Sequence, residues 1–464
     1  MALARSGFVV AGSRTLPGMT ADVRTGPVFR QPGTVLTDHM FTVPLDHQKP
    51  GGEQIEVFAR EVAPAGRRDG GAGLPWLVYL QGGPGFGSPR PFGRESWLNR
   101  ALDDYRVLLL DQRGTGRSTP ASRHTLARLG SPRAQADYLA HFRADSIVRD
   151  AELIRRRLTG DEPWSLLGQS FGGFCTVTYL SFAPEGVREA LIAGGLPGLE
   201  ATADDVYRIT YPIVAERNRR HYERFPMDAD RARAVARHLA SHEVIMPGGG
   251  RLTVPAFQSL GRMLGASRGS DTLHYLLEDA FAGPGLPGAA LSGATLSDAF
   301  LARVAAELSF AEAPLYALVH EACCAQGPAT RWAADRIMAE FPEFDPAAAV
   351  DGDITFLFTG EMIYPWMFET DPVLRPLRDA GEELAQRDSW PRLYDPARLA
   401  ASDVPAAAAV YYEDMYVPRA LSVPTARAIR GLRPWITNEY QHDGLANSNG
   451  AVLDRLIALA RGTA

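Results

Sequence analysis

The sequence predicts an α/β fold, with a mostly parallel central sheet, helices on both faces and an inserted helical cap. Short apolar runs typical of buried strands occur at residues 76–80, 106–110, 164–167 and 190–195. Before the third run, apolar residues recur at helical spacing at Ile147, Ala151, Ile154 and Leu158. Strands that alternate with such helices indicate a mostly parallel sheet.

Four segments are expected along the 464 residues. Residues 1–37 are rich in glycine, proline and small polar side chains, which predicts a flexible arm. Residues 38–195 form the first part of the core and begin with strands at 41–45 and 55–59. Residues 196–350, rich in alanine and arginine, predict the cap. Residues 351–464 complete the core, with the boundary between cap and core left open.

Composition excludes several classes of protein. The net charge is −6, and no basic tract favours a nucleic-acid partner. No apolar run reaches the roughly 18 residues of a membrane span, and residues 1–8 lack a secretory signal pattern. Three cysteines, Cys175, Cys323 and Cys324, cannot form a disulfide framework. We therefore expect a cytoplasmic protein without membrane or nucleic-acid partners; the sequence leaves its oligomeric state open.

Residues 168–172 (Gly-Gln-Ser-Phe-Gly) have the pattern of a nucleophile elbow, in which a serine is exposed at a tight turn between strand and helix. The glycines keep Cβ atoms away from that turn, so Ser170 is the candidate nucleophile. An ordinary glycine-rich turn is the alternative.

A second glycine cluster at residues 81–85 offers main-chain amides for an oxyanion, with Gly83 and Phe171 as the expected donors. A phosphate cradle is disfavoured because the loop has neither a Gly-Lys-Ser/Thr ending nor an acid at dinucleotide spacing.

A serine nucleophile requires a base and an acid that orients it, in the chain order serine, acid, histidine. Of ten histidines, only His442 lies in the last hundred residues, in a polar loop after an apolar run. The preceding run at 404–412 ends in Glu413 and Asp414. Side chains at a strand end alternate in direction, so only one of these carboxylates reaches the imidazole, and Asp414 is predicted.

These residues resemble the proline iminopeptidases, which are prolyl aminopeptidases of the α/β-hydrolase fold. The matching motifs are residues 81–85, 111–118 (Asp-Gln-Arg-Gly-Thr-Gly-Arg-Ser), 168–173 and the acid and histidine loops, which together span about 40–460. One position differs from the family pattern: this chain has Gln81 where the family usually has histidine. The resemblance implies a serine aminopeptidase that acts through an acyl-enzyme, without cofactor or metal, on short peptides with a free N-terminal proline.

The same resemblance implies that cap carboxylates meet the cationic amine of the substrate, with Glu321 and Glu361 as candidates. Aromatic neighbours of Glu361, Tyr364 and Trp366, are candidates for the wall around the pyrrolidine ring. Gly82 is assigned to the substrate-binding loop. His320 and Glu321 begin a pattern like that of zinc proteases, but Cys324 replaces the second histidine, so no metal is predicted.

Two other classes remain open. Fold and triad do not fix the substrate, so a capped carboxylesterase or another small-molecule serine hydrolase fits the same motifs. A non-enzymatic ligand receptor built on this scaffold is the second alternative, which the intact set of catalytic residue types disfavours.

Overall fold

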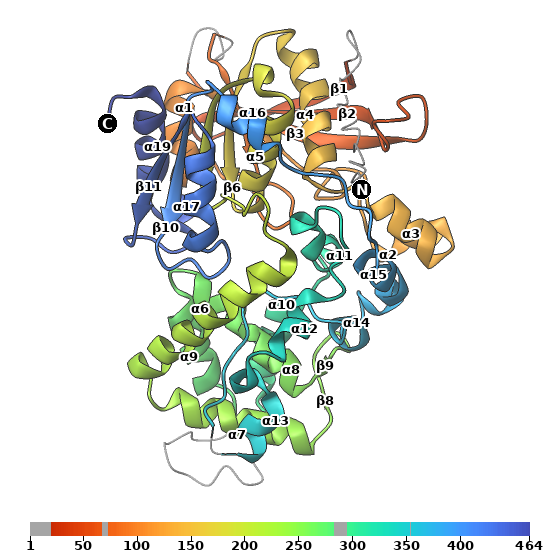
Figure 1. The fold of residues 1–464 in the computed structure, drawn as a ribbon, viewed down its shortest axis with the longest axis vertical. Helices are drawn as coiled ribbons and strands as arrows, with labels where there is room; N and C mark the ends of the chain where they lie inside the picture. The colour runs from red at the N-terminus through yellow and green to blue at the C-terminus, as the bar shows by residue number, and fades with distance from the viewer. Residues whose placement is uncertain (1–19, 67–72, 283–294, 353) are drawn as a thin grey trace, which may run out of the picture.

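The computed structural model describes residues 20–66, 73–282, 295–352 and 354–464. It has two lobes, one built around the central sheet and one built from helices (Figure 1). Strands from before and after the helical lobe belong to the same sheet, so the helical lobe is an insertion rather than a terminal domain.

The central sheet has nine strands in the order β1-β2-β3-β5-β4-β6-β7-β10-β11. The strands are β1 (Asp22–Gln31), β2 (Thr34–Pro44), β3 (Gln54–Pro64), β4 (Trp76–Leu80), β5 (Arg106–Leu110), β6 (Trp164–Gln169), β7 (Val187–Ala193), β10 (Ala406–Tyr411) and β11 (Leu432–Thr437). All pairings from β5 to β11 are parallel, while β1, β2 and β3 run antiparallel. The predicted mostly parallel sheet is confirmed.

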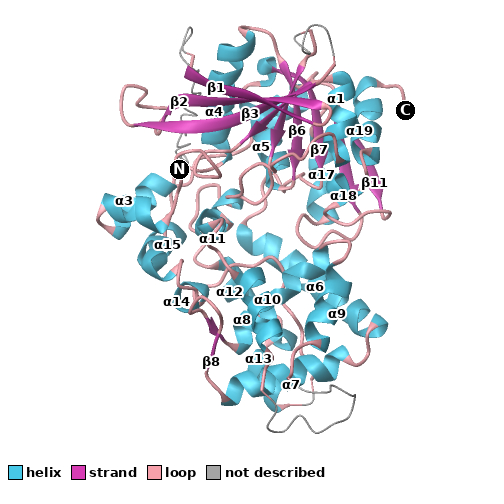
Figure 2. Cartoon of the chain, turned by 180° about the vertical axis from the view of Figure 1, so that it is seen from behind, coloured by secondary structure: helices cyan, strands magenta, loops and turns pink. Residues whose placement is uncertain are grey.

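Helices cover both faces of this sheet (Figure 2). Leu77 and Tyr79 of β4 pack in one buried cluster with α1 (Ser96–Asp104) and α19 (Ala451–Arg461). Val78 and Leu80 point the other way, into the cluster that holds α4 (Ala144–Thr159), α5 (Phe171–Phe182) and α17 (Arg419–Ala428). Strands buried on both faces explain why β4 reads as a continuous apolar run rather than an alternating one.

The N-terminal segment differs from the expected flexible arm. Within residues 1–37, β1 and the start of β2 form an antiparallel hairpin around the two-residue turn Pro32-Gly33, with Gly33 at φ +74°. The prediction is therefore wrong for residues 22–37, while residues 1–19 lie outside the described residues. β1 is largely exposed, so it carries no apolar periodicity, and its place is set by main-chain pairing with β2.

The cap begins after β7 with α6 (Ala203–Arg224). Its first turn is fixed by a capping box: Thr202 Oγ1 accepts from the Asp205 amide at 3.2 Å, and Asp205 Oδ2 accepts from the Thr202 amide at 3.0 Å. Further cap helices are α7 (Asp228–Ser241), α8 (Val254–Gln258), α9 (Gly269–Glu278), α10 (Asp298–Leu308), α11 (Pro314–Val319), α12 (Ala333–Met338), α13 (Pro346–Asp351), α14 (Met367–Thr370) and α15 (Arg378–Ala385).

The predicted end of the cap at residue 350 is too early. The central sheet resumes only with β10 at Ala406, after α14, α15 and α16 (Pro396–Ala401). The misplacement has a simple cause: residues 351–400 contain apolar side chains that pack among helices, and their short runs resemble strand material. Across the described ranges, no helix is both long and apolar enough to cross a bilayer.

Candidate active site

Ser170 sits between β6 and α5 in a backbone conformation that is rare for a residue with a side chain, φ +54° and ψ −124°. The turn is crowded by main chain: a Cβ at Gly172 would lie 1.8 Å from the Leu80 carbonyl oxygen, and one at Gly168 would lie 2.4 Å from the Gly172 oxygen. Only glycine fits at both positions. The local sequence thus produces the strained elbow that presents a serine hydroxyl at the carboxyl edge of the sheet.

The loop after β4 lies against this elbow. A Cβ on Gly82 would be 2.8 Å from the Ser170 Cβ, so the loop approaches the serine as closely as glycine permits. Gly83, at φ +128°, and Phe171 both line the cavity that contains Ser170. Within the described chain, neither the Gly83 nor the Phe171 amide donates a hydrogen bond. Two unused N–H groups beside a serine hydroxyl are suited to binding an oxyanion.

Gln81 keeps this loop tied to the sheet. Its side-chain oxygen accepts from the Tyr79 hydroxyl at 2.8 Å, and its main-chain oxygen accepts from Gln112 Nε2 at 3.0 Å. Gln112 belongs to the motif at residues 111–118, whose Asp111 also accepts from Arg90 and from the Ser88 amide. The motif therefore braces the active-site loops.

Asp414 and His442 form a buried, hydrogen-bonded pair. His442 Nδ1 lies 2.7 Å from Asp414 Oδ2, and the other carboxylate oxygen of Asp414 accepts from the amides of Tyr416 (2.9 Å) and Val417 (3.0 Å). The imidazole lies at the end of β7, where a Cβ on Gly194 would be 3.2 Å from Nδ1. Because the Ser170 amide donates to the carbonyl of Ala193, at the end of the same strand, the ring and the elbow share one edge of the sheet.

The electrostatics of His442 are set mainly by two opposing effects. Burial alone lowers the pKa of an imidazole, but the charge of Asp414 and the hydrogen bond to it outweigh burial, so the pKa of His442 is raised above 6.5. The Tyr416 ring meets the imidazole edge to face at 4.8 Å. Asp443, the next residue in the chain, points away and accepts from the Ser267 amide at 3.0 Å.

Glu413 does not compete for the imidazole. Its carboxylate pairs with Arg220 at 2.5 Å and Arg217 at 3.7 Å, both on α6 of the cap. The two adjacent acids therefore diverge, as the alternation at a strand end predicts.

Glu321 and Glu361 both line the cavity of Ser170. Glu321 is buried; its Oε1 accepts from the Ala334 amide at 3.0 Å, and its Oε2 has no partner in the described chain. Burial raises the pKa of this carboxyl above 4.5. Glu361 is half-buried and accepts from the Tyr316 hydroxyl at 2.8 Å. A buried carboxylate oxygen without a donor can accept a hydrogen bond from a cationic group.

The predicted aromatic wall beside Glu361 is wrong. Trp366 lines a neighbouring cavity, and the Tyr364 hydroxyl hydrogen-bonds to Tyr211 at 2.9 Å. The apolar lining of the Ser170 cavity comes instead from residues that the sequence did not single out, namely Phe174, Leu196, Val206, Tyr207, Met415, Val417 and Leu421. Met415 and Val417 lie close to Asp414 in the sequence, which could have identified them as lining residues. No feature of the sequence near Tyr207 on α6 pointed to the cavity.

The fold, the strained elbow serine, the free amides and the buried His–Asp pair together define a serine hydrolase. A family model described as the alpha/beta hydrolase fold matches residues 75–283. A proline iminopeptidase of Aeromonas sobria is 51% identical over 424 residues, which cover 91% of this chain and 96% of that protein. One of Aspergillus aculeatus is 35% identical over 442 residues, 92% of this chain and 94% of the relative. A tripeptidyl aminopeptidase of Streptomyces lividans is 28% identical over 184 residues, 32% of this chain and 34% of the relative.

The chain thus belongs to the proline iminopeptidase family of α/β-hydrolases.

Proposed function

We propose that this protein is a serine aminopeptidase that releases proline from the N-terminus of short peptides through an acyl-enzyme. Ser170 Oγ attacks the carbonyl carbon of the first residue while His442 takes the hydroxyl proton. His442 then gives that proton to the amine of the leaving peptide, and the prolyl group stays on Ser170 as an ester. Water, deprotonated by His442, attacks the ester and releases proline.

Asp414 holds the imidazole so that its other nitrogen faces the serine, and stabilises the positive charge that forms on the ring. The Gly83 and Phe171 amides donate to the oxyanion of both tetrahedral intermediates. Removing one donor of this kind typically lowers the rate about 100- to 1000-fold. Gly82 permits the loop to approach the serine this closely.

The observation that supports the aminopeptidase assignment is the buried carboxylate of Glu321, which lines the Ser170 cavity and whose Oε2 has no hydrogen-bond partner among the described residues. A peptide amine is cationic at neutral pH and satisfies this oxygen with a charge-assisted hydrogen bond. Glu361 contributes a second negative charge on the same cavity. An amine anchored there places the first residue of the substrate in the Ser170 cavity, whose apolar lining suits a pyrrolidine ring.

The test is a panel of aminoacyl 4-nitroanilides. The proline compound with a free amine is expected to be hydrolysed much faster than its N-acetyl form and faster than the alanine compound, with Ser170→Ala inactive. Indifference to acetylation contradicts the amine anchor. Activity on short-chain esters alone points to a carboxylesterase, and no turnover of any substrate points to a receptor.

A cytoplasmic, reducing location completes the proposal. The adjacent thiols of Cys323 and Cys324 lie 3.7 Å apart without a bond, and Cys175 is buried in α5. Free, closely spaced thiols suit a compartment that keeps them reduced. Localisation of the native protein by cell fractionation tests this.

A further inference from the structure

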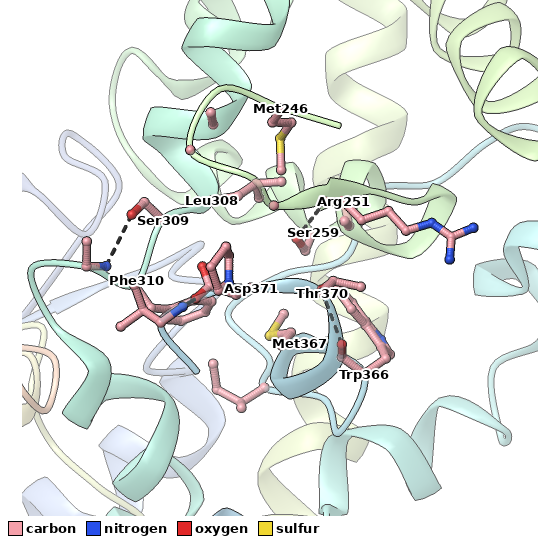
Figure 3. A pocket seen from close by; sticks show the side chains of 18 of the residues that line it. Met246, Arg251, Ser259, Leu308, Ser309, Phe310, Trp366, Met367, Thr370 and Asp371 are labelled. Atoms are coloured by element: carbon pink, nitrogen blue, oxygen red, sulfur yellow. Dashed lines mark hydrogen bonds between the residues drawn. The ribbon is translucent and has the colours of Figure 1, made fainter. Parts of the chain in front are cut away.

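A second cavity, of about 280 Å³, lies in the cap beside the Ser170 cavity. Glu361 lines both cavities. The wall of the second cavity is mainly apolar, and Figure 3 shows Leu308, Phe310, Trp366 and Met367 facing its interior. The catalytic mechanism proposed above does not use this space.

The 3₁₀ helix that supplies Ser259 and Arg262 to the wall of the second cavity also contacts the loop that carries His442. The amine of the departing peptide must lie next to His442, since that ring protonates it. His442 donates its main-chain amide to the Gly265 oxygen at 3.4 Å, and Gly265 ends the 3₁₀ helix Ser259–Gly265. Tyr416, whose ring packs on His442, donates its hydroxyl to the carbonyl of Arg262 in the same helix. The helix that carries Arg262 therefore packs against both the His442 loop and the Tyr416 ring.

Arg262 carries a positive charge that no described carboxylate neutralises. It lines the second cavity, and its guanidinium donates to the Glu307 carbonyl. Across the described part of the chain, Arg262 forms no ion pair, although most arginines of the cap do. An unpaired guanidinium on an apolar cavity wall is a binding site for a carboxylate, which it holds with two N–H groups.

The other charged groups on this cavity are less suited to that role. The Arg251 guanidinium extends away from the cavity centre, as Figure 3 shows, and lies 3.8 Å from Glu243. Arg123 is exposed. Of the two acids on the wall, Asp371 uses its Oδ1 to accept from the Val373 and Leu374 amides, and Glu361 accepts from the Tyr316 hydroxyl. Of the three arginines that line this cavity, Arg123 and Arg251 are exposed and Arg262 is half-buried.

We propose that this cavity binds the C-terminal part of the substrate, and that Arg262 pairs with the free carboxylate of a proline-headed di- or tripeptide. This inference rests on the proposed function. The substrate is then held at both ends, with its amine at Glu321 and its carboxylate at Arg262, and the apolar wall takes the side chain that follows proline. The protein is a peptidase for the last products of protein breakdown rather than for long chains.

The experiment compares Pro-Leu and Pro-Leu-Gly with their C-terminal amides. For the unaltered protein, the kcat/KM of at least one free acid is expected to exceed that of its amide about ten- to hundredfold, the usual range for a charge-assisted hydrogen bond. Arg262→Gln is expected to reduce this ratio to near one, mainly through KM, and Arg262→Lys to keep part of it. The matched control is Arg303→Gln on α10, an exposed arginine paired with Asp279 at 3.0 Å outside the cavity, which is expected to keep the full ratio.

Equal kcat/KM for both acids and their amides in the unaltered protein overturns the inference, and so does an undiminished ratio in Arg262→Gln. Because the unaltered protein supplies the first comparison, a variant that fails to fold does not block the test. Hydrolysis of prolyl 4-nitroanilide, which has no carboxylate, reports on the proposed function separately.

Discussion

His442 Nδ1 lies 2.7 Å from Asp414 Oδ2, while the neighbouring carboxylate of Glu413 turns to Arg220 in the cap. One carboxylate of the adjacent pair thus orients the imidazole, and the other ties the core to α6. The same strand end therefore holds the proposed catalytic acid and attaches the cap to the core.

Asp414→Asn is expected to lower kcat about 10⁴-fold with the fold intact. The amide oxygen can still accept from Tyr416 and Val417, but its N–H₂ group facing Nδ1 favours the wrong imidazole tautomer. Circular dichroism and kcat on prolyl 4-nitroanilide provide the check. Glu413→Gln is the matched control and is expected to keep kcat within a few-fold, since it removes a charge that points at α6. A similar loss in both variants contradicts the assignment of the acid.

The pH dependence of kcat/KM follows from the raised pKa of His442. The imidazole acts as a base only when neutral, so activity rises with pH through an ionisation whose midpoint lies above 6.5. Asp414 stabilises the protonated ring, so the residual activity of Asp414→Asn is expected to show its midpoint at lower pH. A pH profile of both proteins measures this, and a midpoint that stays in place rules out the electrostatic role.

Glu321→Gln is expected to reduce kcat/KM for prolyl 4-nitroanilide about ten- to hundredfold. The variant keeps the acceptor for the Ala334 amide but loses the charge that meets the substrate amine. The preference for a free over an acetylated amine is expected to fall in parallel. Glu361→Gln is compared as the second acid; its carboxylate already accepts from Tyr316, so a smaller loss is expected. An unaltered preference in Glu321→Gln excludes it as the anchor.

Gly82→Ala tests the close approach of the loop to the elbow. The new Cβ would lie 2.5 Å from Gln169 Oε1 and 2.8 Å from the Ser170 Cβ, so the loop must move and carry the Gly83 amide with it. We expect kcat to fall about 100- to 1000-fold, as for loss of an oxyanion donor. Gly51→Ala, where no atom lies within 4 Å, is the control and is expected to be unaffected. Unchanged kcat in Gly82→Ala contradicts the role of the loop.

Local patterns predicted the strained turn at Ser170 and the glycine loop that lies against it, because each depends on residues adjacent in sequence. The order serine, acid, histidine followed from the fold class, and the catalytic roles stay predictions. At Gly172 an added Cβ would lie 1.8 Å from the Leu80 carbonyl oxygen, so the turn requires glycine there, and that glycine can be recognised in the sequence. The parallel strands were equally visible, since burial on both faces makes them uniformly apolar.

Features that depend on distant pairing could not be predicted in this way. β1 is held by its main-chain ladder with β2, so its exposed side chains carry no strand signal. Tyr207 of α6 lines the same cavity as Ser170 although the two are far apart in the sequence, and Arg262 gains its place through contacts with Tyr416 and Glu307. Helical and strand-like apolar runs also look alike when short, which misplaced the end of the cap.

The central claim is that Ser170 attacks a prolyl carbonyl whose free amine is anchored in the cap. A diphenyl phosphonate analogue of proline reports on both parts at once, because it forms a stable adduct with an activated serine. We predict one adduct per chain, mapped by peptide mass spectrometry to Ser170, forming much faster with a free than with an acetylated amine. An adduct elsewhere, no adduct, or equal rates for the two forms would contradict the account.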